Sequence, residues 1–131
     1  MGPTELLRQA RTILLIDWPS RDVPDTLARA GYAVVAADGP APDDYAAYEW
    51  NGVAVVTRRV GAPPDHAELV YSHRPLAELP RIIALARQVG AKAIWCQTGS
   101  VEARSVVESA GLEYVDAPTI TEAVRILGSR R

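Results

Sequence analysis

Side chains suited to binding a small polar ligand are concentrated in four segments of the chain, residues 17–22, 38–43, 72–76 and 97–100. Guanidinium groups bind phosphates through charge-assisted hydrogen bonds, while carboxylates and amides bind hydroxyl groups. Glycines in the same segments allow a ligand to approach the backbone closely. The residues concerned are Ser20, Arg21, Asp38, Gly39, His73, Arg74, Gln97, Thr98 and Gly99.

The elements that must position these segments are short apolar strands alternating with helices. Apolar runs at residues 12–17, 33–37, 68–72, 93–96 and 113–115 lack polar alternation, as expected for strands covered on both faces. Helical patterns of about ten residues lie between them, and strands alternating with helices indicate a parallel sheet. We therefore predict a doubly wound, Rossmann-like α/β fold, with residues 1–131 as a single domain. In this fold ligands bind beyond the carboxyl ends of the strands, where the four segments lie.

Helices are predicted at residues 4–10, 24–30, 79–89 and 101–110, with a last helix beginning near residue 121. Ser100 and Thr121 are the expected N-caps of the last two helices. The middle of the chain departs from this rhythm. Residues 38–44 are predicted to be a loop leading into one short helical turn, and residues 52–58 an edge strand or hairpin. Three aromatic residues in this region either line a groove or anchor the segment: Tyr45, Tyr48 and Trp50.

The first segment lacks the glycines of a dinucleotide-binding turn. It reads Asp17-Trp-Pro-Ser-Arg-Asp22, so a pyrophosphate cannot be cradled there by a glycine-rich loop as nicotinamide and flavin cofactors usually are. Ser20 and Arg21 can still hold a phosphate by their side chains, although Asp17 would oppose one placed close to it. Arg21 as a solvated surface charge is an equally good interpretation.

Two further residues have alternative interpretations. Asp38 follows the second strand, where an acidic residue typically binds a ribose hydroxyl, but it is also a good turn former. His73 could serve as an acid or base, yet no nucleophile or paired carboxylate accompanies it in the sequence, which favours a plain loop histidine. Cys96 and Trp95 lie inside a predicted strand and are interpreted as core residues.

Composition limits the ligands, the metal sites and the cellular location that we expect for this chain. The 131 residues carry 14 basic and 16 acidic side chains, a net charge of -2 that argues against binding along a nucleic-acid backbone. A single cysteine excludes an internal disulfide and disfavours a cysteine-based metal cluster. With neither a signal-peptide pattern nor an apolar run long enough for a membrane span, a cytoplasmic location is expected.

Several of these segments resemble a known family. Gly90-Ala-Lys-Ala-Ile-Trp-Cys-Gln-Thr-Gly99 resembles the Gly-Ala-Lys-x-x-Trp-x-Gln-x-Gly block of the small, single-domain CoA-binding proteins. Their Rossmann-like fold is shared with the CoA-binding domain of the succinyl-CoA synthetase alpha subunit. Glu68-Leu-Val-Tyr-Ser-His-Arg74 is similar to the family's acidic-apolar strand that ends before an arginine, and Ser20-Arg21 is similar to its first-loop pair.

The resemblance implies a nucleotide lying across the first, second and fourth segments. Arg21 and Arg74 would then bind phosphates, and Gln97 would lie near the pantetheine. The full candidate binding set is Trp18, Pro19, Ser20, Arg21, Asp38, Gly39, Pro40, His73, Arg74, Gln97, Thr98 and Gly99. The implied ligand is coenzyme A or an acyl-CoA, bound without catalysis.

This sequence departs from the family pattern at three ligand-loop positions. Asp17 stands where the family has a glycine, Asp38-Gly39-Pro40 replaces Asn-Pro, and Thr119 stands near a usual cysteine. The alternative is therefore a member that has lost nucleotide binding and acts as a protein-interaction or regulatory module, with a protein partner or a second copy. A third interpretation is a small oxidoreductase or transferase that uses His73.

Overall fold

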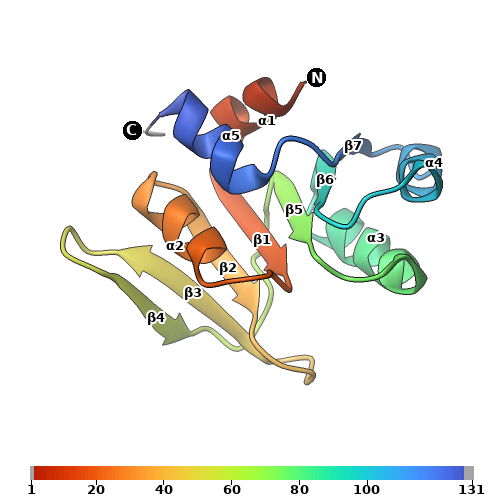
Figure 1. Ribbon diagram of the computed structural model, residues 1–131. Helices are drawn as coiled ribbons and strands as arrows, with labels where there is room; N and C mark the ends of the chain where they lie inside the picture. Colours follow the sequence, from red (N-terminus) through yellow and green to blue (C-terminus); the bar gives the residue numbers. More distant parts are fainter. Residues whose placement is uncertain (1, 129–131) are drawn as a thin grey trace.

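Residues 2–128 are described by a computed structural model, in which seven strands form one sheet in the order β4-β3-β2-β1-β5-β6-β7 (Figure 1). The strands are β1 (Thr12–Ile16), β2 (Ala33–Ala37), β3 (Tyr45–Trp50), β4 (Val55–Arg59), β5 (Leu69–Ser72), β6 (Ala93–Cys96) and β7 (Glu113–Val115). The helices are α1 (Pro3–Gln9), α2 (Asp22–Arg29), α3 (Leu79–Gln88), α4 (Val101–Ser109) and α5 (Ile120–Leu127), with a single 3₁₀ turn, η1 (Leu76–Glu78), before α3.

Five neighbouring strands, β2, β1, β5, β6 and β7, run parallel, as the unalternating apolar runs predicted. In the centre, Leu14 pairs with Val35 on one side and Val70 on the other. Leu14 and Val70 are fully buried, because helices cover this part of the sheet from both sides. The predicted Rossmann-like, doubly wound fold is confirmed.

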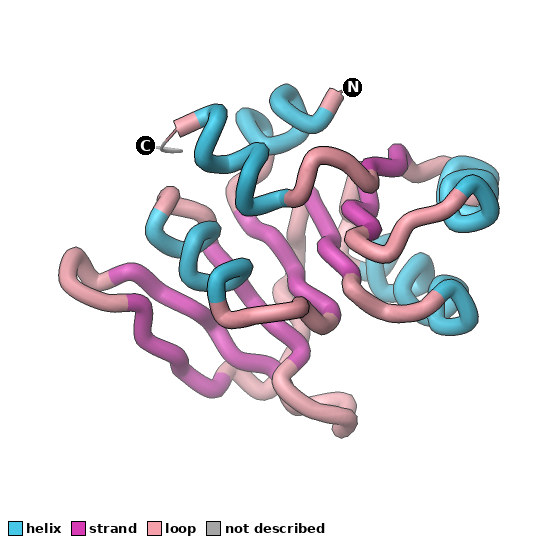
Figure 2. Tube along the Cα trace, in the orientation of Figure 1, coloured by secondary structure: helices cyan, strands magenta, loops and turns pink. Residues whose placement is uncertain are grey.

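The helices divide into two layers (Figures 1 and 2). α1, α2 and α5 pack on one face, where Leu7, Leu27 and Ile120 meet the side chain of Leu15. α3 and α4 pack on the other face against Leu14 and Ile16. None of the described helices has both the length and the apolar character needed to cross a membrane.

Strand β6, which lies between β5 and β7, confirms the core interpretation of Trp95 and Cys96. The side chain of Trp95 is fully buried, and its indole N–H donates to the Pro118 carbonyl at 3.2 Å. Cys96 is a buried free thiol, and burial raises its pKa to about 11, with a smaller contribution from the Asp116 carboxylate. A thiol with so high a pKa is not ionised near neutrality and is a poor nucleophile.

The helical turn predicted after residues 38–44 is wrong. Residues 45–50 instead form β3, which pairs antiparallel with β2 and with β4. Ala46, Ala47 and Glu49 favour a helix on local propensity, but pairing with β2 overrides that preference because it buries both alanines and Tyr48. The edge hairpin predicted for this region is present, and Tyr48 anchors it in the core.

The predicted N-cap of α4 is confirmed, and the predicted N-cap of α5 is wrong. The Ser100 hydroxyl accepts a hydrogen bond from the Ala103 N–H at 3.0 Å, so it caps α4 as expected. Thr119, not Thr121, caps α5, and it accepts from the Glu122 N–H at 3.3 Å. Thr119 and Glu122 have the Thr-x-x-Glu spacing of a capping box, a signal present in the sequence. Thr121 is instead buried in the first turn of α5.

The start of β1 is held by a carboxylate that precedes β5. Glu68 Oε1 accepts hydrogen bonds from the Arg11 N–H at 2.7 Å and the Thr12 N–H at 2.9 Å. Its other oxygen lies 3.0 Å from His66 Nε2. Partial burial opposes ionisation of Glu68, but these hydrogen bonds outweigh it, so its pKa lies below the ordinary value of 4.5.

Replacing Glu68 should therefore destabilise the protein in a pH-dependent way. We expect Glu68→Ala to lower the free energy of unfolding by about 1–3 kcal/mol at neutral pH, since two backbone N–H groups lose their acceptor. Because the folded-state pKa is depressed, the stabilisation is complete above the ordinary pKa and declines as the pH falls through the folded value. Urea denaturation of wild type, Glu68→Gln and the exposed control Glu108→Gln from pH 7 to pH 3 checks this. A gap between wild type and Glu68→Gln that stays constant with pH contradicts it.

Candidate functional site

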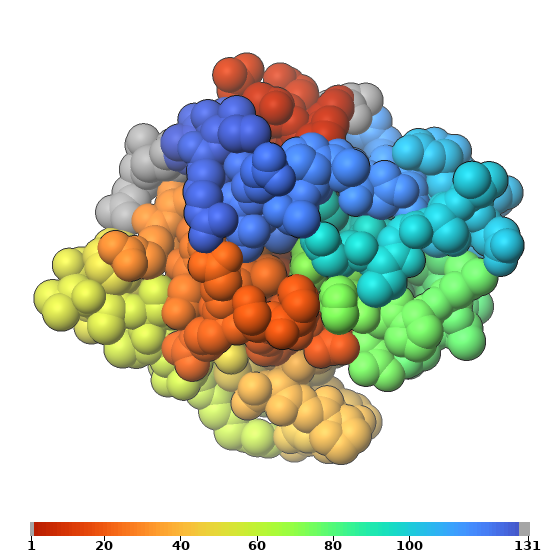
Figure 3. All heavy atoms as spheres, viewed as in Figure 1, coloured from red at the N-terminus to blue at the C-terminus, as the bar shows by residue number. Residues whose placement is uncertain are grey.

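A cavity of about 740 Å³ lies at the carboxyl ends of β1, β2 and β5. β1 is the strand at which the chain order reverses, with β2 on one side and β5 on the other, and ligands of open α/β sheets bind at this position. The segments that surround it follow β1, β2 and β5 or belong to η1 and α3, and they are coloured orange, light orange and green in the lower half of Figure 3. The cavity is lined by Ile16, Asp17, Trp18, Ala37, Asp38, Gly39, Pro40, Arg74, Glu78 and Arg81.

Part of the predicted binding set comes together in this cavity. Trp18, Asp38, Gly39, Pro40 and Arg74 line it. The remaining members lie outside its lining: Pro19, Ser20, Arg21, His73, Gln97, Thr98 and Gly99.

Arg74 is the central charged group of the cavity. Its Nη1 lies 3.2 Å from Asp17 Oδ2, and its Nε lies 2.8 Å from Glu78 Oε2, which also accepts from Nη2. Glu78 Oε1 in turn accepts from Arg81 Nη2 at 2.8 Å. Hydrogen bonds from Arg74 and then Arg81 hold the pKa of Glu78 below its ordinary value. Both arginines of the cavity are thus engaged by carboxylates of the chain itself.

Asp17 adopts a backbone conformation that normally belongs to glycine. Its φ of 63° lies in the left-handed region, at the position where the resemblance in sequence implies a glycine. A non-glycine residue there costs about 1–2 kcal/mol, although aspartate tolerates it better than most because its side chain bonds locally. Asp17 Oδ1 accepts from the Trp18 N–H at 3.0 Å, which leaves Oδ2 for Arg74. The substitution keeps the turn and adds a carboxylate to the cavity.

Arg21, predicted to bind phosphate, has partners on its own side of the first loop. Its Nε donates to Asp25 Oδ1 at 2.8 Å, and its guanidinium carbon lies 5.0 Å from the Tyr48 ring centroid. Trp18 meets the same ring edge to face, with centroids 6.1 Å apart. These contacts pack the first loop onto β3 and direct Arg21 away from the cavity that Arg74 lines.

Hydrogen bonds to Thr98 and Ser72 hold the backbone of Arg74 in place. The Thr98 hydroxyl donates to the Arg74 carbonyl oxygen at 2.9 Å, and the Arg74 N–H donates to Ser72 Oγ at 3.1 Å. Gln97 Oε1 accepts from the Tyr71 hydroxyl at 3.2 Å. Thr98 and Gln97, both in the predicted set, are therefore positioned to hold the loop that carries Arg74.

Asp38 and Gly39 form a tight turn at the mouth of the cavity. The Asp38 N–H donates to the Asp44 carbonyl oxygen at 2.6 Å, and a Cβ on Gly39 would lie 2.5 Å from Asp44 Oδ2. The turn-former interpretation of Asp38 thus describes its backbone. Its carboxylate is exposed and lines the cavity, where it can accept from a hydroxyl group.

Within residues 2–128 the structure places no catalytic partner beside the His73 imidazole and no cluster of metal ligands. The His73 N–H donates to the Ile16 carbonyl oxygen at 3.2 Å and so extends the strand pairing, but its imidazole has no hydrogen bond or ion pair in this range. The same range holds no group of three or more His, Cys, Asp or Glu side chains arranged to bind a metal.

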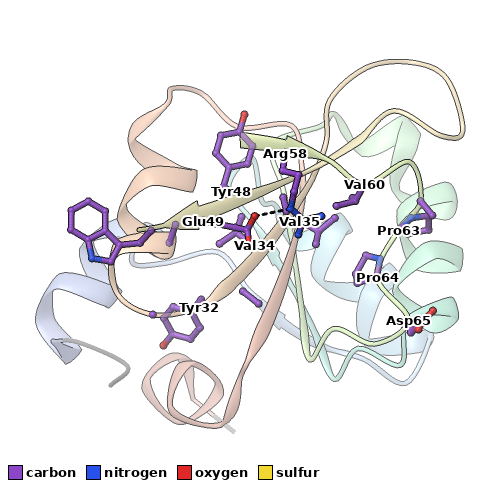
Figure 4. A pocket seen from close by; sticks show the side chains of 16 residues that line it. Tyr32, Val34, Val35, Tyr48, Glu49, Arg58, Val60, Pro63, Pro64 and Asp65 are labelled. Atoms are coloured by element: carbon purple, nitrogen blue, oxygen red, sulfur yellow. Dashed lines mark hydrogen bonds and ion pairs between the residues drawn. The ribbon is translucent and has the colours of Figure 1, made fainter. Parts of the chain in front are cut away.

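A second cavity, of about 660 Å³, lies away from the strand ends (Figure 4). It is formed by β2, the β3–β4 hairpin and residues 60–65, and it contains none of the residues predicted to bind CoA. Tyr48 and Trp50, predicted either to line a groove or to anchor their segment, both line it. Arg58 Nε and Glu49 Oε1 form an ion pair of 2.9 Å across the hairpin there. The charges of Arg58 and Glu49 in this cavity are therefore paired with each other.

Two charged residues of the strand-end cavity, Glu78 and Arg81, were not predicted from the sequence. Arg74 is a loop residue, as predicted, and the extended Pro75 separates it from η1. Helical spacing therefore relates Glu78 only to Arg81, and the turn at Pro75 brings Arg74 to them.

Gly99, the last residue of the block at residues 90–99, is required by close packing. A Cβ there would lie 2.0 Å from the Tyr114 hydroxyl oxygen and 2.5 Å from Asp116 Cβ. That hydroxyl accepts from the Ser100 N–H at 2.9 Å and contacts Asp116 Oδ2 at 3.0 Å. Burial and the Asp116 contact raise the pKa of Tyr114 to about 12, so it stays a neutral donor.

We expect Gly99→Ala to destabilise the protein by about 1–3 kcal/mol, since the tyrosine or the loop must shift to admit a methyl group. Tyr114→Phe removes the nearest clashing atom and should reduce the penalty of Gly99→Ala in the double variant. Thermal denaturation of the two single variants and the double variant measures this coupling. Strictly additive losses would contradict the packing explanation.

Two solved structures share this fold. A crystal structure described as Prb, the PH1109 protein redesigned for binding, is 22% identical with a TM-score of 0.64, covering 95% of this chain and 89% of that chain. The cell-free protein ID.343 from Thermus thermophilus is 22% identical with a TM-score of 0.65, covering 97% of this chain and 99% of that chain. No curated protein matches this chain.

The family comparison extends through the strand-end cavity. The CoA binding domain family matches residues 16–123, a stretch that runs from the end of β1 into α5 and contains every residue lining the cavity. This stretch is well over half of the 131 residues. The chain therefore belongs to the CoA binding domain family.

Proposed function

We propose that the protein binds coenzyme A or an acyl-CoA in the cavity at the carboxyl ends of β1, β2 and β5, without catalysing a reaction. The observation that carries the proposal is the placement of Arg74 in that cavity, with its guanidinium partly exposed. Arginine matches the geometry of phosphate oxygens, and CoA carries a diphosphate and a 3′-phosphate. Membership of the CoA binding domain family supports the same ligand.

The shape and remaining chemistry of the cavity fit a nucleotide. Its volume of about 740 Å³ lies within the range of small-molecule sites, which are roughly 300–1,000 Å³. Asp38 offers a carboxylate to a ribose hydroxyl, and Trp18 with Ile16 provides apolar surface. Gly39 and Pro40 form a wall that a ligand can approach closely.

The non-catalytic part of the proposal rests on what surrounds the cavity. Cys96 is buried with a raised pKa, so it does not offer a thiolate. His73 lies outside the lining of the cavity, and its imidazole is not paired with a nucleophile or carboxylate within residues 2–128. General acid or base catalysis requires a group within hydrogen-bond reach of the substrate, and two of the carboxylates that line the cavity, Asp17 and Glu78, are engaged by Arg74.

Calorimetric titration with CoA, acetyl-CoA, ATP and NAD tests the proposal. CoA and acetyl-CoA should bind, with acetyl-CoA recovered intact, and Arg74→Gln should weaken binding about tenfold or more, since a charged hydrogen bond contributes about 1.5–3 kcal/mol. Arg58→Gln makes the same change in net charge at the distant hairpin and should leave affinity unchanged. Absence of CoA binding at millimolar concentration by folded wild type would overturn the proposal.

A second candidate function is favoured by the acidic side chains of the cavity. Asp17 and Glu78 occupy Arg74, and a carboxylate near a diphosphate repels it. On this alternative the chain keeps the fold of a CoA binding domain but has lost the nucleotide, and it acts through a protein partner.

Asp17→Gly discriminates between the two candidates. Glycine adopts the left-handed conformation without strain and removes the charge, so the variant should fold at least as well as wild type. We expect its CoA affinity to rise about fivefold, because one negative charge leaves the phosphate site. Asp17→Asn, which tolerates the same φ, is the matched variant and should behave alike. CoA binding by both variants but not by wild type would instead favour the second candidate.

A further inference from the structure

Glu78 lies between two guanidinium groups at the edge of the strand-end cavity. Its Oε2 accepts from Arg74 at 2.8 Å, and its Oε1 accepts from Arg81 at 2.8 Å. The side chain of Arg74 is 40% exposed, that of Glu78 28% and that of Arg81 59%, so a ligand in solution can reach all three. The arrangement is a carboxylate held from two sides by arginine donors.

We propose that Arg74 and Arg81 form a phosphate subsite that Glu78 occupies in the free protein and that a phosphate group of the ligand takes over on binding. Arginine donors match carboxylate and phosphate oxygens with similar geometry, so the position of the Glu78 carboxylate marks where an anion is held. The proposal rests on the CoA site proposed above and adds to it a second cation, Arg81, and a competing group, Glu78.

Displacing Glu78 disturbs little of the fold. It is the last residue of η1 and the N-cap of α3, but its side chain makes no capping hydrogen bond. Ion pairs this exposed contribute little net stability, because water solvates the separated charges well. A phosphate is a stronger competitor than water, since it is an anion with more acceptor oxygens than a carboxylate, and the 3′-phosphate of CoA, a monoester, also carries more negative charge.

The start of α3 reinforces the subsite. α3 is ten residues long and begins with Leu79 next to Glu78, and the partial positive charge of a helix N-terminus favours an anion there. After displacement, Glu78 remains on the same turn and repels the phosphate that replaces it. Glu78 is therefore a specificity-determining residue, which lowers affinity for phosphate-bearing ligands without altering contacts to the rest of the ligand.

Glu78→Gln tests the subsite directly. The variant keeps the size of the side chain and removes the charge, and we expect CoA affinity to rise about five- to tenfold. Pantetheine, which carries no phosphate, should bind equally to wild type and variant. Dephospho-CoA, which lacks the 3′-phosphate, shows which phosphate is concerned. If Glu78→Gln binds dephospho-CoA more tightly than wild type does, the subsite holds the diphosphate. If the two bind it equally, the subsite holds the 3′-phosphate.

Three variants serve as controls. Glu49→Gln removes an exposed carboxylate from a comparable pair, the 2.9 Å contact with Arg58, and makes the same change in net charge far from the strand-end cavity. Its CoA affinity should match wild type. Arg81→Gln should weaken CoA binding about fivefold, and the double variant Glu78→Gln/Arg81→Gln should lose the gain of Glu78→Gln. Thermal denaturation verifies that each variant is folded.

The outcomes separate this inference from the proposed function. If wild type binds CoA and Glu78→Gln binds no better, the subsite is overturned while the proposed function stands. If CoA binds to Glu78→Gln but not to wild type, the proposed function fails and the subsite is supported. If CoA binds to neither, inorganic pyrophosphate decides the subsite by NMR. Larger shifts of the Arg74 and Arg81 Nε–H signals in Glu78→Gln than in wild type support it, and equal or absent shifts overturn it.

Discussion

Burial of β1 on both faces and both edges is the constraint on which the rest of the structure depends. Ile13, Leu14 and Leu15 are fully buried, with neighbouring residues of this strand facing opposite helical layers. β1 pairs in parallel with β2 and β5, so the carboxyl ends of three strands meet at one edge of the sheet. Segments far apart in the sequence, after residues 16, 37 and 72, thereby surround one cavity.

The charges at that edge balance one another. Arg74 and Arg81 face Asp17 and Glu78, while Asp38 lines the same cavity. The near-neutral composition of the chain is thus reproduced locally, at the position where the fold binds ligands. Because these groups are partly exposed, their mutual attraction is weak enough for a ligand phosphate to compete with it.

The sequence predicted the parallel core well because its signals are local and unambiguous. Unbroken, short apolar runs such as residues 12–16 are typical of strands buried on both faces, and the turn signals that bound them favour strands over helices. β3 was missed for the opposite reason: Ala46 and Ala47 have little strand preference, and only pairing with β2 makes the segment extended. The candidate site was predicted in part. Residue type alone could not show that Arg21 turns toward Asp25 and Tyr48 while Arg74 faces the cavity.

What the sequence by itself determined is the class of fold and the edge of the sheet where a ligand site is expected. These follow from hydrophobic pattern, strand order rules and a resemblance carried by contiguous residues. The tertiary structure alone decided which charges meet. Asp17 and Arg74 are 57 residues apart in the chain but form a 3.2 Å contact, because β1 and β5 are neighbours in the sheet and end at the same edge. Ion pairs between such distant residues depend on strand order and side-chain direction, neither of which the local sequence specifies.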